Sequence, residues 1–408
     1  MSTIMNKYFT LIILSFVGLF SLACIWDRDT IEMERQRFPN TLEIISGKFL
    51  RHSPEFYQWR VEDREAKLKI NPKQWNYYDD LAVAYEKLGN HAKAIELMLQ
   101  KEKLHPGQYE TYANLGTFYI HNKEYQKGLQ YIDKAIAINP NAHFGREVYQ
   151  KHLVEYVLSK MQNGKVGLPL SKSGAKKYTS FYRFLQEKNV IKNSPKAAIK
   201  GVLGMMKFGN FRSPVLLEAL GDLLRMHDKQ VDENANILAY IAYQKAAKEV
   251  KNPDAKTGYS SIDNLIFYDI EKYSDKPTQK KARKILKKAI QEGELFYQQI
   301  KNDEIRWISE GKNPEEEFKK KYYNNPGKQT PKKTITTTKE ETKPESTVAK
   351  VKTKNTSKTT PSTQPNKKVN QTPNRKEKTL PLLPMILAFV GTLIVVGIVI
   401  KLREGMKT

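Results

Sequence analysis

The sequence predicts an all-α protein whose body is a solenoid of helical hairpins, followed by a disordered linker and a C-terminal transmembrane helix. Three observations predict this fold class. Two stretches of the body repeat one pattern at a fixed spacing, residues 325–379 are basic and poor in large apolar side chains, and residues 380–400 carry no charge. Patterns typical of strands are almost absent.

The N-terminus, residues 1–24, has the layout of a secretory signal peptide or an N-terminal membrane anchor. One lysine precedes an uncharged stretch that ends at Trp26, and the small Ala23 sits next to Cys24, the single cysteine of the chain. The sequence SLAC resembles the lipobox of bacterial lipoproteins, and this resemblance implies lipidation of Cys24. Ser21 stands where Leu is most common, and the stretch is long enough for an uncleaved membrane helix, so both alternatives remain open.

Residues 25–73 are predicted to form an N-terminal helical cap. They include EFYQWRVEDREAKL, which precedes Pro72, and the even spacing of Pro72, Pro106 and Pro140 predicts one more repeat helix there. The sequence WDRDT at residues 26–30 is interpreted as a charged flank of the membrane segment, because two carboxylates are too few for a calcium loop. The stretch GKFLRHSPEFYQWR either binds a polar ligand or packs its aromatic side chains on the first repeat, and packing is favoured.

Residues 74–142 contain two copies of one pattern. The aligned pairs are Leu81 and Leu115, Ala82 and Gly116, Tyr85 and Tyr119, Ala94 and Gly128, Met98 and Ile132, and Pro106 and Pro140. Small residues at two of these positions allow two helices to approach closely, and the proline ends the second helix. The pattern resembles the tetratricopeptide repeat, which has two antiparallel helices in about 34 residues.

This resemblance implies a concave groove, lined by the first helix of each repeat, that binds a protein or peptide segment. In the matched register the groove residues are Asn76, Asp79, Val83, Glu86, Lys87, Glu110, Ala113, Thr117, Ile120 and His121. The family's clamp for C-terminal carboxylates needs Lys and Asn where this chain has Asp79 and Val83, so a different kind of segment is expected.

Residues 143–324 are predicted to be an irregular helical region related to the repeats. Leu216–Leu224 and Ile237–Val250 predict a third, irregular helix pair, and Lys280–Glu310 predicts a long terminal helix that caps the array. The join between good and irregular repeats is rich in Gly, Pro and Lys, which indicates loops followed by a short helix.

The C-terminal part of the chain is predicted to be a tether. The linker at residues 325–379 has 14 Lys or Arg against 4 Asp or Glu and should be disordered. Residues 380–400 are long enough to span a membrane as a helix, and residues 401–408 are the expected cytoplasmic tail. With the first apolar segment directing export, the body is expected outside the cytoplasm.

We find no motif for a nucleophile, a phosphate loop, a metal or a dinucleotide, so no enzyme, cofactor or metal is predicted. His91, His105 and His121 are interpreted as surface or packing residues. The start WDRDT, with HSPEFY and the repeats, resembles a group of bacterial envelope proteins over roughly residues 24–254.

The predicted function is therefore a membrane-anchored scaffold in the envelope that binds other proteins. Two alternatives stay open: a tether that binds cell wall or anionic lipid through the basic linker, and an enzyme with an unrecognised site in residues 160–254. The net charge of +25 also raises nucleic acid as a partner, but no recognition motif supports it.

Overall fold

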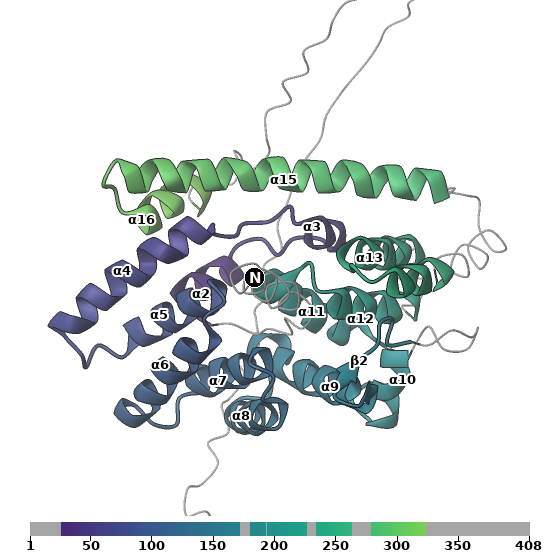
Figure 1. Cartoon of the computed structure of the whole chain (residues 1–408), viewed down its shortest axis with the longest axis horizontal. Coiled ribbons are helices and arrows are strands. Elements are labelled where there is room, and N and C mark those ends of the chain that lie inside the picture. The colour runs from purple at the N-terminus through teal and green to yellow at the C-terminus, as the bar shows by residue number, and fades with distance from the viewer. Residues whose placement is uncertain (1–25, 172–179, 193, 227–233, 263–278, 324–408) are drawn as a thin grey trace, which may run out of the picture. The chain divides into compact units, whose positions relative to one another are not determined.

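The chain is described by a computed structural model over five ranges, residues 26–171, 180–192, 194–226, 234–262 and 279–323 (Figure 1). The predicted signal or anchor with Cys24, the linker at 325–379, the apolar segment at 380–400 and the tail at 401–408 lie outside these ranges. Within the five ranges, each helix is either too short or too polar to cross a membrane.

The first half of the described chain consists of helices joined by short turns. In chain order these are α2 (Arg28–Arg35), α3 (Thr41–Ser46), α4 (Pro54–Ile70), α5 (Asn76–Lys87), α6 (His91–Leu104), α7 (Tyr109–His121) and α8 (Tyr125–Ile138). The pairs α5–α6 and α7–α8 are the two predicted hairpins, and α4 packs on α5 as the predicted helix of a preceding repeat.

The second half is less regular. It contains η1 (Ala142–Phe144), α9 (Arg146–Ser159), β1 (Met161–Gln162), β2 (Lys165–Val166), α10 (Ser180–Glu187), α11 (Lys196–Met205), η2 (Met206–Asn210), α12 (Pro214–Arg225), α13 (Ala235–Glu249), α15 (Gln279–Ser309), α16 (Pro314–Phe318) and η3 (Lys319–Tyr323). The segments predicted as an irregular helix pair form α12 and α13, and the segment predicted as a long terminal helix forms α15. A short antiparallel hairpin, β1–β2, was not predicted.

The helices from α4 to α15 form a closed circuit of contacts, which Figure 1 shows as a ring of ribbons around α2. Each of α4 to α9 packs on the next, α9 packs on α11, and the series continues through α12 and α13 to α15. Helix α15 then packs on both α13 and α4 and so joins the two ends of the array. A long helix with one buried stripe suits this role, because it covers apolar surface on repeats at both ends.

Two glycines explain the close approach of α7 and α8. A Cβ at Gly116 would lie 2.6 Å from Ile132 Cγ1, and a Cβ at Gly128 would lie 2.6 Å from Ile120 Cγ1. Both distances are far below van der Waals contact, so a side chain at either position would push the helices apart. The helices α12 and α13 also approach closely at a glycine, because a Cβ at Gly221 would lie 2.5 Å from the Tyr243 ring.

The turns within the two hairpins also correspond. Gly89 has a φ of 85° and is followed by Asn90, whose side chain caps α6. The equivalent residue in the next repeat is Lys123, which adopts the same left-handed backbone with a φ of 66°. The turn geometry of the repeat is therefore kept even where glycine is absent, at the steric cost of a side chain in that region.

Candidate functional site

The main feature inside the circuit is residues 26–35, which we call the central segment. Asn114 of α7 clamps its first residue: the main-chain N–H of Trp26 donates to Asn114 Oδ1 at 2.8 Å, and Asn114 Nδ2 donates to the Trp26 carbonyl at 2.9 Å. The Trp26 side chain is buried against Ala113 and Ala135, whose small side chains leave room for the indole between α7 and α8. The amide side chain thus satisfies the backbone of a buried residue that lies ahead of the first turn of α2.

The Trp26 ring also has polar neighbours. The Arg146 guanidinium lies over it at 4.3 Å from the ring centroid, and the His143 ring centroid is 3.3 Å away. The indole Nε1–H donates to Glu147 Oε1 at 3.4 Å. A buried tryptophan with a satisfied N–H and a cation on its face is a strong anchor for the segment that carries it.

Two aspartates of the central segment pair with one arginine of α4. Arg60 Nη1 lies 2.9 Å from Asp27 Oδ2, and Arg60 Nη2 pairs with Asp29. All three residues are buried, and Asp27 also caps α2 by accepting from the main-chain N–H of Thr30. The interpretation of residues 26–30 as a charged flank is therefore wrong, because these carboxylates are used inside the fold.

The ion pairs continue into α5 and α16. Arg28 Nη2 lies 2.6 Å from Asp80 Oδ2, and Arg64 Nε lies 2.9 Å from the same oxygen. Arg60 and Arg64 both pair with Glu315. Burial by itself would raise the pKa of Glu315, but the two guanidinium groups outweigh it and lower the pKa to about 2. One charged cluster thus joins α2, α4, α5 and α16.

The far end of the central segment is held by lysines from two other elements. Lys207 of η2 donates to the Met33 carbonyl at 2.9 Å, and Lys319 of η3 lies 2.8 Å from Glu32 Oε1. The segment is therefore anchored along its length.

None of the ten predicted groove residues is exposed. Six are buried and four are partly buried; the buried ones are Asp79, Val83, Glu86, Ala113, Thr117 and Ile120, and the others are Asn76, Lys87, Glu110 and His121. The sequence analysis expects an open groove at these positions. The chain's own residues cover them, and binding of a partner there stays a prediction.

The polar groove residues have partners within the chain. Asp79 pairs with Lys101 at 2.6 Å, Gln150 donates to the Thr117 hydroxyl at 3.1 Å, and Lys87 donates to a carbonyl of η2 at 2.6 Å. Burial raises the pKa of Asp79 to about 7, although Lys101 opposes the rise. These side chains are therefore committed to contacts that stabilise the fold.

Two of the predicted groove residues, Glu86 and His121, form a cluster with His91, which was not a predicted groove residue. Glu86 lies between His91, at 2.8 Å from Nδ1 to Oε2, and His121, whose Nδ1 pairs with Oε1. Burial opposes the effect, yet the two imidazoles lower the pKa of Glu86 to about 2, and Glu86 raises the pKa of His91. The alignment of the two repeats could have predicted this contact. His121 is equivalent to Lys87, which is next to Glu86, so the two side chains lie at neighbouring positions of adjacent repeats.

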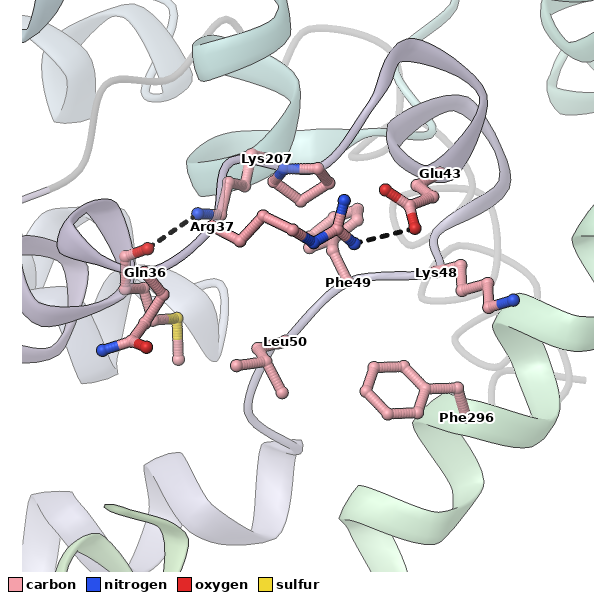
Figure 2. A pocket seen from close by; sticks show the side chains of 10 residues that line it. Gln36, Arg37, Glu43, Lys48, Phe49, Leu50, Lys207 and Phe296 are labelled. Carbon is pink, nitrogen blue, oxygen red and sulfur yellow. Dashed lines mark hydrogen bonds and ion pairs between the residues drawn. The ribbon is translucent and has the colours of Figure 1, made fainter. Parts of the chain in front are cut away.

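A small cavity of about 150 Å³ lies beside the central segment (Figure 2). Its lining comprises Met33, Gln36, Arg37, Pro39, Glu43, Lys48, Phe49, Leu50, Lys207 and Phe296. Its three cationic side chains are each paired: Arg37 with Glu43 at 2.8 Å, Lys207 with the Met33 carbonyl at 2.9 Å, and Lys48 with Glu292 at 2.9 Å. The cavity has room for a few water molecules. Arg37 and Lys48 are paired with carboxylates, whereas the ammonium group of Lys207 is hydrogen-bonded to a neutral carbonyl.

Two buried carboxylates of α12 bear on the alternative of an enzyme site in residues 160–254. Glu218 accepts from the main-chain N–H groups of Leu170 and Ser171, and Asp222 accepts from that of Phe181. Burial raises the pKa of both carboxyls. Their hydrogen bonds hold the backbone at residues 170–171 and at Phe181 against α12, which is a structural role for both side chains.

A family model described as the tetratricopeptide repeat matches residues 109–142, the stretch that contains α7 and α8. This is the repeat with the two close-packed glycines and the Asn114 clamp. A search of curated proteins finds no match. The chain therefore contains a tetratricopeptide repeat at residues 109–142.

Proposed function

We propose that the chain is a membrane-tethered scaffold in the bacterial cell envelope, whose helical body binds other proteins and carries out no catalysis. Tetratricopeptide repeats are interaction modules, so the repeat supports the binding role. Residues of the central segment and of η2 contact the interior face of the repeats at Asn114, Asp80 and Lys87. A partner would therefore bind on the outer surface of the body.

The observation that carries this proposal is a row of exposed apolar residues at the repeat spacing. Ile70, Leu104 and Ile138 are the last residues of α4, α6 and α8, and each lies one repeat period from the next. Their exposed fractions are 87%, 43% and 48%. Successive repeats are equivalent, so the three residues occupy the same point of three neighbouring units, and we call them the apolar row.

The surroundings of the apolar row indicate the chemistry of its partner. Exposed lysines, Lys69 and Lys103, precede two of its members. Isolated apolar side chains are common on protein surfaces. Apolar residues that recur at the repeat period, beside exposed lysines, favour a surface that binds a partner. An extended or helical protein segment that carries apolar and acidic side chains fits this edge.

The tether rests on the two apolar terminal segments, both outside the described residues. Trp26 is buried, and only one residue separates it from Cys24. An anchor at the N-terminus, by lipid on Cys24 or by an uncleaved helix, would hold the body against the membrane with little slack. A second anchor at residues 380–400 would be separated from the body by a long linker.

The scaffold proposal is tested by photo-crosslinking in intact cells. A photoreactive amino acid replaces Leu104 or Ile138 in the full-length chain. Ala92, which is exposed at the other end of α6 and lies about 18 Å along the helix from Leu104, is the matched control position. We expect one discrete protein adduct at 104 and 138 and none at 92. Adducts to lipid alone would overturn the scaffold and favour an electrostatic tether to anionic lipid.

Sidedness needs a separate measurement. Protease added to cells whose outer membrane has been made permeable decides whether the body lies outside the cytoplasm, in the periplasm, and the mass of the mature N-terminus decides whether Cys24 is lipidated. A body that resists protease in these cells but not in lysed cells would contradict the envelope location.

A further inference from the structure

Glu86, His91 and His121 form a cluster of three side chains that can each ligate a metal ion. Its three candidate ligand atoms, one from each side chain, all lie within 4.8 Å of one another. Glu86 is 5% exposed, and both of its oxygens are taken by imidazole nitrogens. Within the described ranges, no Lys or Arg pairs with this carboxylate.

The second imidazole is only half satisfied. The side chain of His121 is 6% exposed, its Nδ1 pairs with Glu86, and its Nε2 is buried without a hydrogen-bond partner among the described residues. A buried polar atom without a partner costs free energy, which a bound cation could recover by ligation or by reorienting the ring. His91 is more open, with 21% of its side chain exposed, and gives solvent a way to the cluster.

We propose that Glu86, His91 and His121 form a binding site for a divalent transition-metal ion of the zinc class. Two imidazole nitrogens and one carboxylate oxygen are a ligand set that zinc uses with a water molecule in the fourth position. Bonds of about 2.1 Å in a tetrahedral arrangement place ligand atoms about 3.4 Å apart. The three candidate ligand atoms reach this separation if the side chains move by about 1 Å.

The position of the site indicates what the ion does. Glu86 lies near the end of α5, His91 begins α6 and His121 ends α7. The ion would therefore join both helices of the first hairpin to the first helix of the second. It would act as a staple between two neighbouring repeats and make their packing depend on metal supply.

The test is calorimetric titration of Zn²⁺ into the full-length protein after removal of metals by a chelator. We expect one Zn²⁺ ion bound per chain, and a higher melting temperature when Zn²⁺ is saturating. Co²⁺ should give the absorption bands of a tetrahedral site. His91→Ala should weaken Zn²⁺ binding by about tenfold or more and should fold normally, because His91 is partly exposed at a helix start.

The matched control is His152→Ala. His152 pairs with one carboxylate, Glu155, at 3.0 Å from Nδ1, and among the described residues no third ligand group joins them. This variant should bind Zn²⁺ as the parent protein does. The proposal is overturned by a parent that shows no saturable binding, or by an H91A variant with unchanged affinity and stoichiometry. In that case the cluster holds only a proton.

Discussion

Replacement of Trp26 by alanine tests whether the central segment is part of the folded core. The indole is 1% exposed and lies between α7 and α8, with a guanidinium on its face. Loss of a fully buried tryptophan typically lowers the free energy of unfolding by about 3–5 kcal/mol. We expect a value in this range for W26A, because the Asn114 clamp keeps the backbone in place and prevents the surroundings from closing on the cavity.

The assay is urea denaturation of the full-length protein, followed by far-ultraviolet circular dichroism. Trp75→Ala is the matched control, because Trp75 is 41% exposed and should cost about 1 kcal/mol or less. If both variants lose less than about 1 kcal/mol, the central segment contributes no core packing, and the reasoning is refuted.

Three further predictions concern the repeats and the charged cluster. Gly116→Ala should lower the free energy of unfolding by about 1–3 kcal/mol in urea, because the new Cβ would lie 2.6 Å from Ile132; a stabilised variant would contradict close packing of α7 and α8. Lys123→Gly should raise the free energy of unfolding by about 0.5–1 kcal/mol, because the φ of 66° suits glycine. A lower free energy of unfolding for this variant would contradict that turn geometry. The pKa of Glu315 is lowered from 4.5 to about 2, so its stabilising effect is complete above pH 4.5 and lost as the pH falls toward 2, a change of about 3 kcal/mol. Glu315→Gln should therefore be less stable at pH 7 but lose less stability between pH 6 and pH 3, and parallel pH profiles would disprove the pairing.

The elements that could be predicted are those whose signal is local. The repeat period placed the hairpins of α5 to α8, since small residues and prolines recur wherever helices touch or end. The same reasoning located α15, because its apolar residues follow a helical period over its whole length.

The site could not be predicted in the same way, because it depends on contacts between distant residues. Asp27 lies 33 residues from Arg60, and Arg60 lies 255 residues from Glu315. After an apolar stretch, a run of charges usually forms a solvated flank, and nothing local distinguishes buried aspartates from exposed ones. An open array would leave the groove positions on α5 and α7 accessible, whereas Trp26 and η2, which are distant in sequence, contact them here.

Hydrogen–deuterium exchange of residues 26–35 in the full-length protein tests the central claim most directly. The main-chain N–H of Trp26 is bound by Asn114, and those of Thr30 and Ile31 by Asp27. We predict that these amides exchange as slowly as those in the middle of α7, since both open only when the body unfolds. Complete exchange of the segment within the first seconds, while α7 stays protected, would contradict the account.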